Sequence, residues 1–461
     1  MLAVVALVVA ACSGPEGTTT APGDPDVSTA PGTGQVDAFG EAIPPAPQVP
    51  TGPLDEALAA DLDTVFGSLL TGVDENVIFR IGRSGDPRVA WLLSDLLRFF
   101  QAGEVAFSSE AAFEDLTGAE ITDDFAWGQA TDWLIAWDMP APPGYVAWKR
   151  IPFEIVEPAW EPFFDDEDAD IDWRLLSWGG VRIDDRPIRL SALPCPEGCI
   201  PALDDPVVTD AAGGDWYPDD ALVFGVVVNG EARAYPKNVM EVHEMVNDTI
   251  GGRRIAMPYC TLCGSAQAYL TDRPPDGFPA HTLELRTSGL LIRSNKLMYE
   301  LHTFSAFDTF LGVGLSGPLQ GHRLEPLTVV TSTWGDWKSA HPATTIVARD
   351  GGIGRSYPDD PLGGRDDAGP IFPIGDVDPR RPVQEQVLGV IAPDGRAVAF
   401  PAAAARESLI AGEAVTEAGV VVRLDGSGLV AEDQGGVAIV SHQAFWFAWS
   451  QFHPGTLVWS P

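Results

Sequence analysis

The chain has 461 residues, of which 45% are hydrophobic, including 14 Trp and 21 Phe. This length and composition are typical of a folded protein with two or three domains. Its 66 acidic and 28 basic residues give a formal net charge of -38, and a surface this acidic repels phosphate backbones. Nucleic acid is therefore excluded as a partner.

The N-terminus predicts export. Residues 1–11 are an apolar run that is too short to span a bilayer and is typical of a signal peptide. The following VAAC resembles a bacterial lipobox, in which Cys12 would be lipidated and become the first mature residue. Residues 12–54, rich in Gly, Pro, Thr and Ser, predict a disordered tether. We therefore expect a lipoprotein of the cell envelope, anchored to the outer face of the cytoplasmic membrane, with an ordinary secretory signal as the alternative.

Residues 55–150 predict an α-helical module. The stretch DPRVAWLLSDLLRFF places Val89, Leu92, Leu93 and Leu96 at helical spacing after an Asp-Pro start signal. DDFAWGQATDWLIAW predicts a second, Trp-rich helix in the same module. Residues 151–190 are a connector rich in Pro, Trp and acidic residues, whose acidic run lacks the spacing of an EF-hand loop.

The remainder of the chain contains an internal duplication. TWGDWKSAHPATTIV and AFWFAWSQFHPGTLV share the pattern W-x2-W-x3-H-P-x-T, and VFGVVVNGEARAYP matches VLGVIAPDGRAVAFP further upstream. Each upstream stretch predicts a β-hairpin followed by a Pro that opens a helix. The sequence thus predicts an α+β protein, in which the helical module precedes a duplicated β-rich domain over 191–461. Copy one would span 191–347, the linker 348–384 and copy two 385–461.

Residues present in both copies are better explained as scaffold, so His341 and His453 are expected to pack or cap. Residues special to copy one are better candidates for function. They are Cys260 and Cys263, together with His243, which corresponds to Ser408 in copy two.

Cys260 and Cys263 lie in MPYCTLCGSAQAY, a C-x2-C-G turn between two strand-like runs. Such a turn points both sulfurs to one side, as in a zinc-ribbon knuckle. His243 lies on a neighbouring predicted helix, and Met298 and His302 would share one face of a predicted strand. Cys, His and Met are soft donors, so this set favours copper, or zinc, as a cofactor. The residues predicted to support the site are Glu244, Asn247, Asp248, Tyr259, Ser265, Asn295 and Tyr299.

Several separate motifs resemble an uncharacterised prokaryotic family, known as domain of unknown function 3179. These motifs are ARAYPKNVMEVHEMVND, YCTLCGS, TSGLLIRSNKLMYE, SGPLQG and TWGDWKSAHPAT, and the similarity covers about 190–461. The resemblance implies no particular activity. After Tyr299 the family pattern has an acid, then Arg, and further on Trp and Gln, where this chain has Glu300, Leu301, Phe307 and Thr309.

The cysteines also allow two other interpretations. Outside the cytoplasm, Cys195 and Cys199 could form a disulfide, with each other or with the C-x2-C pair, and the protein would then be a non-catalytic envelope binding or scaffold protein. Alternatively, C-x2-C could be a redox centre. No other enzyme signature has the right context: GVGLSG is followed by Pro318 where a helix would have to run.

Overall fold

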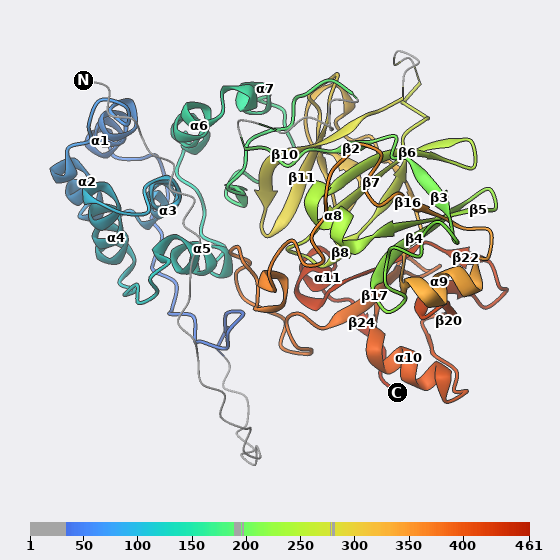
Figure 1. Ribbon diagram of the computed structural model, residues 1–461. Helices are drawn as coiled ribbons and strands as arrows, with labels where there is room; N and C mark the ends of the chain where they lie inside the picture. Colours follow the sequence, from blue (N-terminus) through green and yellow to red (C-terminus); the bar gives the residue numbers. More distant parts are fainter. Residues whose placement is uncertain (1–33, 189–194, 196–197, 277, 279–281) are drawn as a thin grey trace. The chain divides into compact units, whose positions relative to one another are not determined.

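The computed structural model describes residues 34–188, 195, 198–276, 278 and 282–461 (Figure 1). The predicted signal peptide and Cys12 lie outside these residues. Within the described part of the chain, no helix is long and apolar enough to cross a bilayer.

The first part of the described chain, up to Phe164, is helical, as the sequence predicts, and its helices run from blue to teal in Figure 1. The helices are α1 (Glu56–Gly67), α2 (Glu75–Gly82), η1 (Pro87–Val89), α3 (Ala90–Phe99), α4 (Glu104–Thr117), α5 (Ala126–Ala136), α6 (Tyr145–Val156), η2 (Pro158–Trp160) and α7 (Glu161–Phe164). The Asp86 carboxylate accepts the N–H of Arg88 and so caps the turn that leads into α3. Leu92, Leu93 and Leu96 of α3 are then buried in one hydrophobic core with the other helices.

Two segments tie this helical module to the rest of the chain. In the connector, β1 (Leu176–Trp178) pairs with β10 (Leu285–Ile292), and the Trp160 indole N–H donates to Ser288 O over 2.7 Å. Residues 35–52, within the predicted tether, also contact the module: the Trp137 indole donates to Pro44 O over 2.7 Å.

The part of the chain that follows the connector is β-rich, so the chain has the predicted α+β organisation. Its described strands form five small sheets, each named here by one strand. The β10 sheet consists of β1, β10, β11 (Asn295–Glu300), β12 (Ala306–Asp308) and β13 (Val313–Gly314). The β7 sheet consists of β14 (Glu325–Leu327), β9 (Ala268–Leu270), β7 (Arg253–Cys260), β6 (Met245–Ile250) and β2 (Leu203–Asp204), with β8 (Ser265–Ala266) paired to β7.

Three further sheets follow. The β4 sheet consists of β15 (Val330–Thr333), β4 (Leu222–Val228), β5 (Glu231–Pro236), β16 (Thr345–Val347) and β3 (Val208–Asp210). The β17 sheet consists of β23 (Ser441–Phe445), β17 (Gln386–Ile391), β18 (Ala397–Pro401) and β24 (Leu457–Val458). The β20 sheet consists of β19 (Thr416–Glu417), β20 (Val420–Asp425), β21 (Gly428–Asp433) and β22 (Ala438–Ile439).

The β4 and β17 sheets have the same strand order and directions. In the order β15-β4-β5-β16, the first two pairs are antiparallel and the last is parallel. The order β23-β17-β18-β24 repeats this pattern. In each sheet the second strand of the hairpin leads into a helix, α8 (Lys237–His243) or α10 (Ala402–Ile410). The edge strands β15 and β23 likewise lead into α9 (Trp334–Ala340) and α11 (Trp446–Phe452).

The β7 and β10 sheets pack against each other. One hydrophobic cluster combines Ala256 and Tyr269 of the β7 sheet with Met298 and Phe307 of the β10 sheet. Because side chains alternate along a strand, the face that carries Ala256 also carries Cys260. The predicted knuckle therefore lies at the end of a buried interface between two sheets.

Candidate functional site: the buried dithiol of Cys260 and Cys263

The C-x2-C turn links β7 to β8, and Cys260 pairs with Ser265 across this hairpin. Gly264 closes the turn with φ +56°, and a Cβ at this position would come within 2.8 Å of the Phe445 ring. The sequence needs glycine here because a side chain would fit neither the backbone conformation nor the space. Strand β23 holds the turn from the other side, since the Phe445 N–H donates to Cys263 O over 2.8 Å.

Both sulfurs approach the same backbone oxygen. The Sγ atoms of Cys260 and Cys263 lie 3.8 and 3.5 Å from Ser294 O, and Cys263 Sγ lies 3.8 Å from the Asn295 side-chain oxygen. Each cysteine is only 1% exposed, and the two are free thiols. The turn therefore presents a reduced dithiol to the end of the β10 sheet.

A buried ion pair supports the turn. Lys296 Nζ lies 3.1 Å from the Glu244 carboxylate and donates to the backbone oxygen of the same residue over 2.5 Å. The other carboxylate oxygen of Glu244 accepts the hydroxyl of Thr261, inside the C-x2-C turn, over 3.1 Å. Glu244 thus joins the dithiol turn to Lys296 on β11, and removing either charged partner would leave the other buried without compensation.

The environment makes the two sulfurs unequal. Burial raises the pKa of the Cys263 thiol, and the neighbouring Cys260 sulfur and Asp308 raise it further. Burial also acts upward on the pKa of Cys260, but hydrogen bonds from the Cys263 thiol and the Lys296 N–H, together with the Lys296 charge, lower it overall. Cys260 is therefore the sulfur that more readily carries the thiolate.

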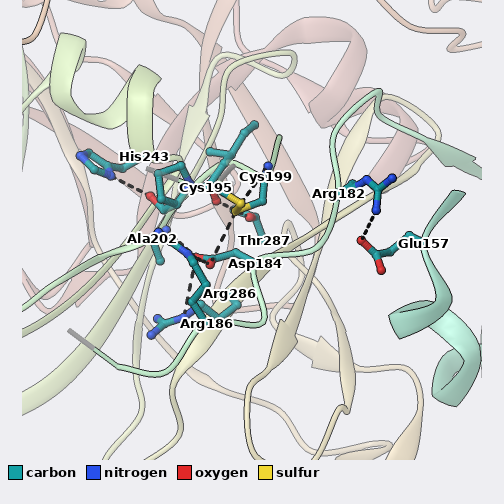
Figure 2. Close-up of a disulfide and its surroundings, with 12 residues drawn as sticks. Glu157, Arg182, Asp184, Arg186, Cys195, Cys199, Ala202, His243, Arg286 and Thr287 are labelled. Atoms are coloured by element: carbon teal, nitrogen blue, oxygen red, sulfur yellow. Dashed lines mark hydrogen bonds and ion pairs between the residues drawn. A yellow bond between two sulfur atoms is a disulfide. The ribbon is translucent and has the colours of Figure 1, made fainter. Parts of the chain in front are cut away.

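His243 does not join the sulfurs. Its Nδ1 lies 2.7 Å from Pro201 O and its Nε2 2.8 Å from the Tyr357 hydroxyl. Since a carbonyl only accepts, Nδ1 carries the proton and Nε2 accepts from the tyrosine. Burial lowers the pKa of His243 to about 4, which keeps the ring neutral. Figure 2 shows the ring directed at the segment that follows Cys199.

The other two cysteines form a disulfide, one of the pairings that the sequence allows. Cys195 and Cys199 are joined with Cα atoms 5.6 Å apart (Figure 2). Beside them the Asp184 carboxylate accepts the N–H of Ala202 over 2.8 Å and the Arg186 guanidinium over 2.6 Å. This disulfide thus closes a small loop that is held by neighbouring charges.

The remaining residues of the predicted ligand set have other surroundings. Met298 is fully buried in the apolar cluster between the β7 and β10 sheets. His302 lies in the turn after β11, where its backbone N–H donates to Glu300. Across the parts of the chain that the structure describes, no three His, Cys, Asp or Glu side chains are grouped to hold a metal ion. The five-residue ligand set is therefore not assembled in this structure.

The predicted supporting residues divide into two groups. Glu244, Ser265 and Asn295 lie at the dithiol turn, as described above. The others serve the framework elsewhere: Tyr259 packs against Phe224, Asn247 binds Asp204 and Leu285, Asp248 binds Arg233 and Tyr235, and the Tyr299 hydroxyl donates to Asp184 O.

Sequence reasoning did not connect four residues with the dithiol: Gln267, Ser294, Lys296 and Thr309, the last of which it named only as a departure from the family pattern. The weak signal for Gln267 is its place two residues after Ser265 in GSAQAY, because alternating strand residues share a face. Ser294 lies in the tight turn before β11 and Lys296 near the start of that strand, but nothing in their spacing points to the cysteines. Thr309 follows a short strand whose pairing the sequence does not reveal.

The fold and the site together define an α+β protein with five small sheets, three of which surround a pair of buried free thiols. Just over half of the chain, residues 197–438, matches the family model for a protein of unknown function, DUF3179. The chain therefore belongs to this family, and the resemblance drawn from its motifs is confirmed. No curated protein and no solved structure matches the chain.

Proposed function

We propose that this protein is an extracytoplasmic lipoprotein whose Cys260 and Cys263 form a redox-active dithiol. The observation that carries the proposal is the pair of free thiols directed at one carbonyl oxygen, on a turn fixed between three sheets. Zinc in proteins takes four ligands as a rule, and this site offers two sulfurs and no third grouped donor among the described residues. A redox role needs only the two sulfurs.

The chemistry is the closure and opening of one disulfide. On oxidation each thiol gives up its hydrogen, and the two electrons and two protons pass to an external disulfide or hydroperoxide. On reduction an external dithiol returns them. Cys260, with the lower pKa, is the nucleophile and Cys263 completes the S–S bond. Lys296 and Glu244 hold the turn in place through both states.

A thiol count tests this function. The double variant Cys195→Ser/Cys199→Ser leaves Cys260 and Cys263 as the only cysteines beyond residue 12. In glutathione buffers of graded potential, followed by alkylation in denaturant, we expect two thiols at low potential and none at high potential, with one reversible midpoint. If the pair forms no disulfide at any potential, the redox proposal fails and a scaffold role is favoured.

A soft metal is the second candidate, and the two adjacent sulfurs favour it. Thiolates prefer Cu(I), for which two sulfur donors can suffice, whereas the site lacks the donors that zinc needs. Metal analysis of the same protein decides between the candidates. One tightly held copper equivalent that disappears in Cys260→Ser would favour metal binding over redox cycling.

The lipoprotein part of the proposal is supported by the sequence alone, through the apolar N-terminal run and the VAAC motif. Changing Cys12 to Ala should move the protein from the membrane fraction to the periplasm or the medium. Unchanged membrane retention of this variant would contradict lipid anchoring.

The proposal further includes the internal duplication. It is supported by the shared strand order of the β4 and β17 sheets and by matching side-chain contacts. The Trp337 indole donates to Thr344 Oγ1 over 2.9 Å, and the Trp449 indole donates to Thr456 Oγ1 over the same distance. His341 stacks on Trp337, with ring centroids 4.0 Å apart. The Trp, His and Thr of the W-x3-H-P-x-T pattern therefore serve packing. A duplicated scaffold would keep such residues in both copies.

A further inference from the structure

Six polar atoms near the dithiol have no hydrogen-bond partner among the described residues. They are Ser265 Oγ, both side-chain polar atoms of Gln267, Ser294 Oγ, Asn295 Nδ2 and Thr309 Oγ1. All five residues are at most 4% exposed. We call these residues the polar cluster.

The topology directs the polar cluster at the dithiol from two sides. Ser265 faces Cys260 across the β7–β8 pair, and the Gln267 N–H donates to Pro258 O over 3.1 Å, which continues the pairing. The side chains of Ser265 and Gln267 therefore emerge on the face that carries Cys260.

The other three residues approach from the β10 sheet. The backbone oxygen of Ser294 contacts both sulfurs, and the side-chain oxygen of Asn295 contacts Cys263. The backbone oxygen of Thr309 accepts the hydroxyl of Tyr269, which lies on the same face as Gln267, over 2.9 Å. The polar cluster thus draws residues from both sheets beside the dithiol.

The energetic cost of this arrangement requires a function for it. A buried polar atom without a partner costs about 1–3 kcal/mol, so six cost about 6–18 kcal/mol. That total is comparable to the whole stability of a domain, about 5–15 kcal/mol. Such groups are satisfied by ordered water or by a small polar ligand, and they are found at redox and catalytic sites.

The charges of the site restrict the class of ligand. The polar cluster contains only hydroxyls and amides, and its two charged neighbours are already engaged. Lys296 pairs with Glu244, and Asp308 accepts the N–H groups of Phe310 and Leu311 over 2.7 and 2.8 Å. An ion bound here would lack a counter-charge, which is costly in a buried site. The ligand must be uncharged and must both donate and accept hydrogen bonds.

Burial restricts the size of any oxidant. At 1% exposure neither sulfur contacts the surface of a partner protein or a bulky disulfide while the turn is closed, so exchange with them, and with glutathione, needs transient opening of the turn and is slow. A hydroperoxide is uncharged, donates and accepts hydrogen bonds, and in its smallest form is little larger than water. We infer that the polar cluster binds a small uncharged hydroperoxide beside Cys260 and Cys263, and that this hydroperoxide is the oxidant of the proposed dithiol. The inference rests on the proposed redox function and names its substrate class.

The two cysteine thiols and one hydroperoxide account for every atom and electron of the reaction. The Cys260 sulfur bonds to one peroxide oxygen, the O–O bond breaks, and the other oxygen leaves as water or an alcohol with the Cys260 proton. This step produces a sulfenic acid on Cys260. The Cys263 sulfur then attacks the sulfenic sulfur, the S–O bond breaks, and the oxygen leaves as water with the Cys263 proton. One disulfide, one water and one alcohol or second water are the products.

The test compares two oxidants on the reduced Cys195→Ser/Cys199→Ser protein. We expect hydrogen peroxide to remove both thiols at least tenfold faster than it oxidises free cysteine. We expect 5,5'-dithiobis(2-nitrobenzoate), a bulky disulfide, to remove neither on the timescale of the peroxide reaction. In addition, Cys263→Ser should trap a sulfenic acid on Cys260, detected with dimedone by mass spectrometry.

A variant of the polar cluster separates binding from folding. Gln267→Leu replaces two unpaired polar atoms by an apolar group of similar size, so its melting temperature should stay equal or rise. Its peroxide rate should fall at least tenfold while the glutathione midpoint of the dithiol stays unchanged. Gln101→Leu, at an exposed position of the helical module, is the matched control and should leave all three quantities unchanged.

Two outcomes would overturn the inference in distinguishable ways. If the dithiol shows a reversible midpoint but peroxide reacts no faster than with free cysteine, the substrate class is wrong and the redox function stands. The same conclusion follows if Gln267→Leu retains the full peroxide rate. If no disulfide forms with any oxidant, both the inference and the proposed function fail.

Discussion

The β4 and β17 sheets share a scaffold and differ in what is inserted into it. In both, a four-strand core carries a buried Trp whose indole donates to a Thr seven residues later. In the β4 sheet the chain between α8 and β15 forms strands of the β7 and β10 sheets, with the dithiol between them. In the β17 sheet the chain between α10 and β23 forms only the β20 sheet.

The comparison shows that the residues repeated in both sheets serve packing. The candidate chemical groups lie in the segment between α8 and β15, which is special to the β4 sheet. His341 and His453 belong to the repeated pattern, and each lies on a Trp ring with centroids about 4 Å apart, at 4.0 and 4.1 Å. Neither approaches a cysteine by any contact of the described residues. The dithiol, Lys296 and the polar cluster all lie in the longer insertion.

The largest expected effect concerns the helix that follows the hairpin in each sheet, α8 or α10. His243→Ser installs the residue that α10 has at the matching position. It removes a buried ring and leaves Pro201 O and the Tyr357 hydroxyl without partners. We expect a loss of about 4 kcal/mol in the free energy of unfolding, measured by denaturant titration. Ser408→Ala on α10 is the matched control and should cost less than about 1 kcal/mol.

The second prediction tests a contact that both sheets share, in which a glycine of the central strand lies against a buried Trp ring. A Cβ on Gly225 would lie 2.4 Å from the Trp337 ring, and a Cβ on Gly389 would lie 2.1 Å from the Trp449 ring. Gly225→Ala and Gly389→Ala should therefore each cost about 2–3 kcal/mol through overpacking. Gly67→Ala, at the end of α1 with open space around it, should be neutral or slightly stabilising. A large cost at one sheet only would show that the two cores are not equivalent.

A smaller effect is expected from the paired hydrogen bonds. Thr344→Val and Thr456→Val keep the side-chain shape but leave the indole N–H of Trp337 or Trp449 buried without an acceptor. Each should cost about 1–2 kcal/mol, and the two costs should agree within about 0.5 kcal/mol. Thermal unfolding of the two variants side by side measures this equality. Unequal losses would weaken the proposed duplication.

The smallest expected effect is on the pH dependence of stability, in which His453 and His341 should differ. Burial lowers the pKa of His453 to about 4, whereas an unfolded His titrates near 6.5. Between these values the unfolded chain binds a proton that the folded chain does not, so stability falls as the pH drops from 6.5 to 4. His453→Gln should flatten this part of the stability profile. His341 is held by Asp425 at 2.8 Å, so His341→Gln should instead lower stability through the lost contact.

Much of the fold could be predicted from the sequence, because it depends on local signals. Asp86 and Pro87 indicate the start of the segment that becomes α3, and the Asn-Gly pair at 229 indicates the β4–β5 hairpin. The pairing of β1 with β10 could not be predicted. It joins strands that are far apart in the chain, and no local pattern records it.

The site could be predicted only in part for the same reason. The C-x2-C-G turn is local, so the two sulfurs, and the glycine that closes the turn, were found. Grouping His243 with the cysteines assumed that neighbouring segments face each other. In fact the Tyr357 hydroxyl and Pro201 O, both distant in sequence, bind its ring. Lys296 was missed because only the packing of two sheets brings it to the sulfurs, and Gln267 was missed although the local β7–β8 pairing places it on the face of Cys260.

The hydrogen bond from Phe445 to Cys263 O has a consequence for the order of events during folding. Cys195 and Cys199 are separated by three residues, so in an oxidising environment their loop closes at little entropic cost as soon as both have been synthesised. The Cys260–Cys263 turn emerges later and stays accessible until β23, near the C-terminus, docks on it. Early closure of the first pair removes the competing thiols from the nascent chain. The chain order therefore protects the dithiol from mispairing before the last strand covers it.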